Sequence, residues 1–132
     1  MSDKDQSDGP RRCLGGRYDL LDRIGAGGGA VVMRARDRQL HRLVAVKLLR
    51  SQDGDRSRFV HESMVLAGID HPAVVRVLAH DSDEGEPYTV LELLKSPDLG
   101  DHLVESGPLP WRRVVEIGIQ IADALDAAHR QG

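Results

Sequence analysis

The chain has 132 residues, of which 40% are hydrophobic and 30% charged, and its formal net charge is −3 at pH 7. This balance is typical of one globular domain, or of part of a larger one, and it is too apolar for an intrinsically disordered chain. Acidic and basic residues are interspersed, which argues against nucleic-acid and membrane-surface partners, and no apolar run approaches the roughly 18 residues that a bilayer span needs. Cys13 is the single cysteine, which excludes an internal disulfide and indicates a cytoplasmic location.

The first part of the chain predicts a leader followed by three strands. Residues 1–16 are polar and predict a disordered leader, so we expect the fold to start near Arg17. The run from Tyr18 to Ile24 predicts the first strand, and β-prone residues 31–35 predict the second. A glycine turn between them indicates a hairpin. Residues 43–49 predict a third strand that is apolar except for Lys47.

The remainder predicts three helices and two more strands. Asp55 can cap a helix that runs to Gly68, residues 74–78 predict a fourth strand, residues 81–86 a polar turn and residues 88–94 a fifth strand. Two prolines, Pro97 and Pro110, suit the starts of two further helices. The predicted class is α+β, with a five-stranded antiparallel sheet and one helix, followed by two helices. The last helix carries an apolar stripe made of Val114, Ile117, Ile121, Leu125 and Ala128.

The glycine turn is a candidate phosphate site. Glycines let backbone N–H groups approach phosphate oxygens and permit the positive φ values of a tight turn. The string from Gly25 to Ala30 also fits the dinucleotide pattern G-x-G-x-x-A, but that pattern requires a helix directly after the glycines. β-branched Val31 and Val32 predict a strand there instead. A plain flexible hairpin turn is the alternative for this turn taken alone.

Lys47 interrupts an apolar strand, and a hairpin returning past the glycine turn would bring its ammonium group beneath that turn. A lysine in a buried strand needs a carboxylate partner, and Glu62 in the predicted helix is the candidate. Taken singly, an edge-strand lysine and a solvated helix glutamate are the alternatives. The sequence leaves open whether these two side chains pair.

In this order and spacing, the glycine turn, Lys47 and Glu62 resemble the start of a bacterial serine/threonine protein kinase of the eukaryotic-like family, over residues 17–132. The resemblance implies an ATP-binding N-terminal lobe and hinge over residues 17–94 and the first helices of a truncated C-terminal lobe over residues 95–132. It implies ATP and Mg²⁺ as cofactors, with Lys47 on the α- and β-phosphates and Glu62 holding Lys47. The residues implied to form the ATP site are Ile24, Gly25, Gly27, Gly28, Val32, Ala45, Lys47, Glu62, Leu91, Glu92 and Leu94.

Within that set the resemblance assigns particular roles. Val32 and Ala45 would enclose the adenine from above, with Leu91 as gatekeeper and the backbone of residues 92–94 as the hinge. The sequence departs from the family pattern at the third glycine, which is Ala30, and at the hinge exit, where Pro97 and Asp98 replace the usual glycines.

The family's catalytic segments H-R-D, D-F-G and A-P-E do not occur in these 132 residues, so the base aspartate and the Mg²⁺ ligands are absent. We therefore expect the ATP-binding portion of a kinase whose parent phosphorylates serine or threonine in proteins. The alternative is a catalytically dead truncated kinase that acts as a nucleotide- or partner-binding module. An uncovered final helix, residues 110–132, would favour self-association.

Overall fold

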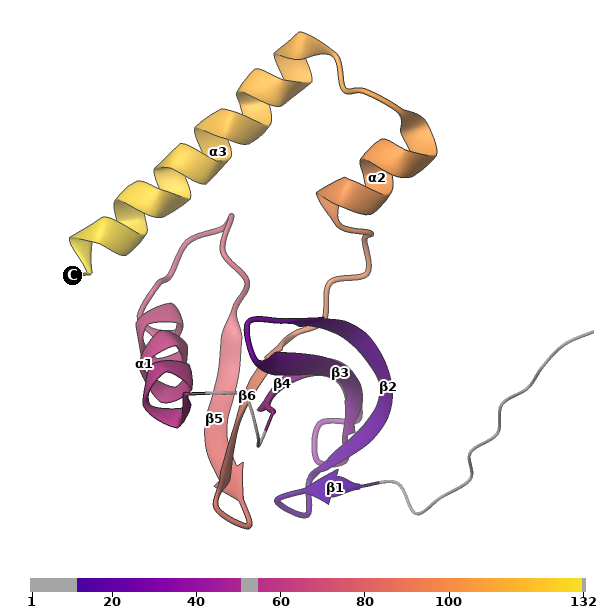
Figure 1. Ribbon diagram of the computed structural model, residues 1–132, viewed down its shortest axis with the longest axis vertical. Coiled ribbons are helices and arrows are strands. Elements are labelled where there is room, and N and C mark those ends of the chain that lie inside the picture. The colour runs from indigo at the N-terminus through magenta and orange to yellow at the C-terminus, as the bar shows by residue number, and fades with distance from the viewer. Residues whose placement is uncertain (1–11, 51–54, 132) are drawn as a thin grey trace, which may run out of the picture.

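The computed structural model describes residues 12–50 and 55–131, which form one sheet and three helices (Figure 1). Every strand pairing in this part is antiparallel, and the order across the sheet is β1-β2-β3-β4-β6-β5. The predicted α+β class is confirmed. The strands are β1 (Cys13–Leu14), β2 (Tyr18–Gly27), β3 (Ala30–Asp37), β4 (Arg42–Leu49), β5 (Val77–Asp83) and β6 (Glu86–Glu92), and the helices are α1 (Arg56–Ala67), α2 (Leu99–Ser106) and α3 (Trp111–Arg130).

The two-residue strand β1 is additional to the five strands that the sequence predicts. Its residues pair with Tyr18 and Asp19 of β2, and Leu14 is fully buried in the core. The prediction of a disordered leader through residue 16 is therefore wrong for its last residues, because burial of Leu14 removes an apolar side chain from water. The rest of that leader, residues 1–11, lies outside the described residues.

The fourth predicted strand is displaced along the chain. β5 spans Val77–Asp83, so it starts later than expected and includes residues predicted to be a polar turn. The actual turn is Glu84 and Gly85, and both have positive φ, as a two-residue type I′ hairpin turn requires. Backbone pairing with β6 holds the polar residues of β5 extended, although their side chains carry no strand signal.

The two faces of β4 pack against different parts of the molecule, one against the main core and the other toward α1. In β4, Val44 and Val46 belong to the main core, and alternation along the strand places Ala45 and Lys47 on the opposite face, toward α1. Burial on both faces explains why β4 reads as a nearly continuous apolar run. The buried residues of the main core are Leu14, Tyr18, Leu20, Ala35, Val44, Val46, Tyr88 and Val90.

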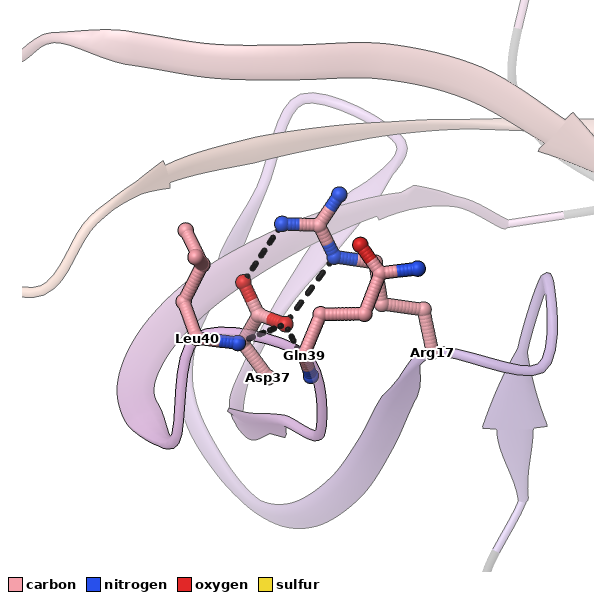
Figure 2. A network of polar contacts seen from close by, with 4 residues as sticks. All are labelled: Arg17, Asp37, Gln39 and Leu40. Atoms are coloured by element: carbon pink, nitrogen blue, oxygen red, sulfur yellow. Dashed lines mark hydrogen bonds and ion pairs between the residues drawn. The ribbon is translucent and has the colours of Figure 1, made fainter.

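Asp37 joins the β3–β4 turn to the start of β2. Its carboxylate accepts hydrogen bonds from the Arg17 guanidinium at 2.9 and 2.8 Å and from the backbone N–H groups of Gln39 and Leu40 at 2.9 and 3.2 Å (Figure 2). The Arg17 guanidinium, helped by these N–H groups, lowers the pKa of Asp37 to about 2 against the opposing effect of burial. This charged network fixes the β3–β4 turn against the strand that leads to the glycine turn.

The helix α1 begins after Asp55 as predicted. The Asp55 carboxylate accepts a hydrogen bond from the backbone N–H of Arg58 at 3.1 Å, and Gly68 forms the C-cap. Phe59 is the one apolar side chain of α1 that is buried, so little apolar surface holds this helix to the sheet.

The helix α2 lies beyond the end of the sheet, and α3 runs from there back toward the end of α1 (Figure 1). The Asp98 carboxylate caps α2 by accepting from the backbone N–H of Asp101 at 2.7 Å, and Pro110 precedes α3. No side chain of these two helices is buried. None of the helices that the structure describes combines the length and the apolar character needed to cross a membrane.

Candidate functional site

The glycine turn joins β2 to β3. Gly27 pairs with Ala30, and between them Gly28 and Gly29 have φ of 58° and 78°. Positive φ at both central positions is the requirement of a type I′ turn, which glycine adopts without strain. Among the residues that the structure describes, and apart from the glycine and its chain neighbours, no atom lies within 4 Å of the position that a Cβ would take at Gly27 or Gly28. Ile24 is half exposed and lies where the pairing of β2 with β3 is irregular.

The register of the sheet brings several predicted site residues together in one strip, which is made of Gly25, Val32, Lys47, Ala45 and Leu91. Val32 of β3 pairs with Lys47 of β4, and Ala45 pairs with Leu91 of β6. Residues paired across strands share a face, and so do residues two apart along a strand. Gly25 of β2 pairs with Val32 in turn. The turn, the lysine and the apolar pair therefore follow one another across the same face of the sheet.

Glu62 does not pair with Lys47. The Glu62 carboxylate binds the guanidinium of Arg58, one helical turn earlier, at 2.9 Å, and no ion pair within 4.0 Å joins these two described residues, Glu62 and Lys47. Instead, the Lys47 ammonium lies over the ring of Phe59, 5.8 Å from its centroid, at the outer range of a cation–π contact. The structure thus answers the question that the sequence left open.

Lys47 and Glu62 nevertheless line the same two hollows. The larger, about 520 Å³, is also bounded by Leu91 and lies between α1 and the sheet. The smaller, about 290 Å³, is also bounded by Gly28 and Arg58. Together the hollows run from Gly28 past Lys47 to Leu91, and their sizes suit a small-molecule ligand.

The predicted hinge follows directly from the end of β6. The backbone N–H of Glu92 donates to the carbonyl of Arg76 at 3.0 Å, and the Glu92 carboxylate accepts from the backbone N–H of Arg76 at 2.9 Å. These bonds tie the end of β6, where the hinge is predicted to begin, to the segment before β5. Leu94 and Leu99 are both largely exposed, at 60% and 47%. Their exposure leaves apolar surface beside the hinge open to a ligand or to other protein segments.

Two polar residues of this region were not predicted from the sequence as site residues. Ser63 and Thr89 both line the 520 Å³ hollow with Lys47, and both are buried. Spacing could have indicated them, because Ser63 lies one helical turn after Phe59 on the same face of α1. Thr89 likewise alternates with Leu91 along β6 and shares its face.

No ligand set for a metal ion is present in the described part of the chain, where no group of three or more His, Cys, Asp or Glu side chains is placed to hold one. The use of Mg²⁺ stays an expectation from the kinase family.

The chain is similar to known protein kinases along most of its length. A family model described as the protein kinase domain matches residues 18–132. The probable serine/threonine-protein kinase CPE1738 of Clostridium perfringens is 38% identical, covering 92% of this chain and 18% of its own length. The serine/threonine-protein kinase PknB of Mycobacterium leprae is also 38% identical, covering 90% and 20%.

A solved structure agrees with this similarity. The crystal structure of Rad53 1-466 in complex with AMP-PNP superimposes with a TM-score of 0.76 at 27% identity, covering 88% of this chain and 31% of that one. The chain spans about a fifth of the length of the curated relatives named above. It belongs to the protein kinase family, in which it corresponds to the N-terminal lobe and the first helices of the C-terminal lobe of bacterial serine/threonine kinases.

Proposed function

We propose that residues 17–94 bind ATP and serve the transfer of its γ-phosphoryl group to serine or threonine side chains of proteins. The observation that carries this proposal is the position of Lys47, which pairs across strands with Val32 and lines a hollow with Gly28. The serine/threonine kinase relatives support the reaction, and the complex of Rad53 with AMP-PNP supports an adenine nucleotide as the ligand.

Different residues would hold different parts of ATP. The backbone N–H groups of Gly25, Gly27 and Gly28 would face the phosphates, because no side chain of the described residues lies within 4 Å of the Cβ position at Gly27 or Gly28. The Lys47 ammonium would attract the α- and β-phosphates, which requires that it leave the Phe59 ring.

The adenine would be held between apolar side chains and the hinge. Val32 and Ala45 would cover one side of the ring, and Leu91 would close the inner end, because all three lie on the strip that carries Lys47. The backbone of Glu92 and Leu94 would supply the polar contacts to the adenine edge. ATP itself supplies the phosphoryl group, and these residues bind and orient it.

Titration of ADP against the purified chain, followed by calorimetry, tests this proposal. We expect a dissociation constant between about 100 μM and 1 mM, equivalent to about 4 to 6 kcal/mol of binding free energy. Lys47→Ala should abolish the response, whereas Arg112→Ala removes one positive charge from the exposed surface of α3 and should not alter it. Equal binding by Lys47→Ala and the unaltered chain would show that the phosphates bind elsewhere.

The alternative function is that of a non-catalytic partner-binding module. The exposure of α3 favours it, since Trp111, Ile119 and Ile121 are 71%, 64% and 53% exposed. Under either function we expect the 132-residue chain to transfer no phosphate from radiolabelled ATP to a generic basic protein, because it contains no H-R-D aspartate. Incorporation above that of Lys47→Ala would contradict this expectation.

A further inference from the structure

A hydrogen bond between two hydroxyl groups connects α1 to the sheet. Ser63 of α1 and Thr89 of β6 are 5% and 1% exposed, and their oxygens are 2.7 Å apart. Apart from Ser63, the only buried side chain of α1 is Phe59. A helix with so little apolar burial depends strongly on any buried polar contact it makes, because each buried hydroxyl that loses its partner is costly.

The donor and the acceptor of each hydrogen bond around this pair can be assigned. The Ser63 hydroxyl donates to the backbone carbonyl of Phe59 at 2.9 Å, and a hydroxyl carries only one proton. Thr89 must therefore donate to Ser63. Thr89 in turn must accept from Nδ1 of His80, 3.0 Å away, so the proton of His80 lies on Nδ1. The chain of donors runs from β5 through β6 to α1.

The hydrogen bond between Ser63 and Thr89 connects α1 to the sheet at the point where an ion pair between Lys47 and Glu62 would also connect them. Ser63 follows Glu62 in the chain, and Thr89 is the cross-strand partner of Lys47. All four side chains line the 520 Å³ hollow. Meanwhile Glu62 is held by Arg58, so the hydroxyl pair, and not the ion pair, connects α1 to the sheet at this point.

We propose that Ser63 and Thr89 are positioning residues that hold α1 in place while Glu62 is bound to Arg58. Because the helix is held at Ser63, Glu62 exchanges Arg58 for Lys47 by rotation of its own side chain, without displacement of α1. This inference rests on the proposed function, in which Glu62 orients Lys47 toward the phosphates of ATP.

The first experiment measures the attachment of α1 without any nucleotide. Thr89→Val removes the hydroxyl at nearly constant shape, and Thr89→Ser keeps it. In hydrogen exchange we expect the amides of residues 59–67 to exchange about threefold to tenfold faster in Thr89→Val, as loss of one hydrogen bond implies, and to be unchanged in Thr89→Ser. Ser63→Ala should reproduce the effect of Thr89→Val, and it replaces that variant if circular dichroism shows that Thr89→Val does not fold. Unchanged exchange in folded Thr89→Val or Ser63→Ala would overturn the inference.

The second experiment tests positioning through a double-mutant cycle on ADP affinity. In the unaltered chain, Glu62→Gln should weaken ADP binding, and in Thr89→Val the same change should have no effect, because α1 no longer presents Glu62 to Lys47. A merely structural role for Thr89 would leave the two effects additive, and additivity would overturn the proposal. If the unaltered chain binds no ADP at all, the proposed function fails, and the exchange experiment alone decides whether the hydroxyl pair attaches α1.

Discussion

His71 and Asp123 form a hydrogen bond of 2.8 Å that connects the loop after α1 to the middle of α3. Nδ1 of His71 accepts from the backbone N–H of Ala73 at 3.0 Å, so Nε2 carries the proton and donates it to the Asp123 carboxylate. The His71 side chain is 12% exposed and Asp123 71%. One end of this contact is therefore fixed in the sheet-bearing part of the molecule, and the other lies on a helix with no buried side chains.

Loss of this bond should loosen α3. In His71→Ala, we expect the amides of residues 111–131 to exchange about threefold to tenfold faster, the effect of one hydrogen bond, while β3 and β4 are unaffected. His129→Ala, which alters an exposed histidine at the end of α3, is the control. Equal exchange in His71→Ala and the unaltered chain would mean that other contacts hold α3.

The Asp37 network should make stability depend on pH in acid. Its folded-state pKa of about 2 lies below the ordinary 3.8, so the ionised form is favoured by folding. The resulting stabilisation is complete above pH 3.8 and is lost as the pH falls toward 2, and it amounts to about 2 kcal/mol. Urea unfolding should show Asp37→Asn less stable by this amount at pH 7, with the difference shrinking toward pH 2.

The control for Asp37 is Asp22→Asn, which removes a carboxylate paired with Arg34 at 2.6 Å on the exposed surface. Exposed ion pairs contribute at most about 1 kcal/mol, so this variant should unfold almost as the unaltered chain does. A difference between Asp37→Asn and the unaltered chain that did not change with pH would place the effect in packing and not in charge.

Arg58 should compete with Lys47 for Glu62. Arg58→Gln frees the carboxylate while keeping a good helix former, and an exposed pair one turn apart contributes about 0.3 to 0.5 kcal/mol, so ADP affinity should rise about twofold. Arg56→Gln, which alters an arginine that lines neither hollow of the site, is the control. The gain should vanish when Glu62→Gln is also present; its persistence there would show that Arg58 acts on the nucleotide directly.

The apolar stripe of α3 should drive self-association of the isolated chain. Ile121 and Leu125 are 53% and 52% exposed, so covering the exposed half of each would contribute roughly 1 kcal/mol, about half of what full burial of such a side chain contributes. Sedimentation should show a concentration-dependent dimer that the combined change Ile121→Lys and Leu125→Lys abolishes. Gln120→Lys adds one charge outside the stripe and should leave association intact. A chain that stays monomeric at high concentration would refute this role for α3.

Features set by neighbours in the chain were predictable from the sequence. Asp55 caps α1 because a short side chain one residue before a helix can satisfy its free N–H groups. The glycine turn closes a hairpin because two glycines with positive φ are flanked by β-prone residues. The position of Lys47 within an apolar strand followed from the same local pattern, and so did the fold class.

Features set by partners distant in the chain needed the tertiary structure. Leu14 is buried only because β1 pairs with the start of β2, and residues 81–83 extend β5 only because β6 lies beside them. Glu62 has a local candidate partner in Arg58, one helical turn away, and a distant one in Lys47, and only the tertiary structure shows that it binds Arg58. The contact of Ser63 with Thr89 also needed the tertiary structure, because local spacing marks these residues merely as inward-facing. Local preferences determine which elements form, and the competition between contacts in the packed molecule decides which side chains meet.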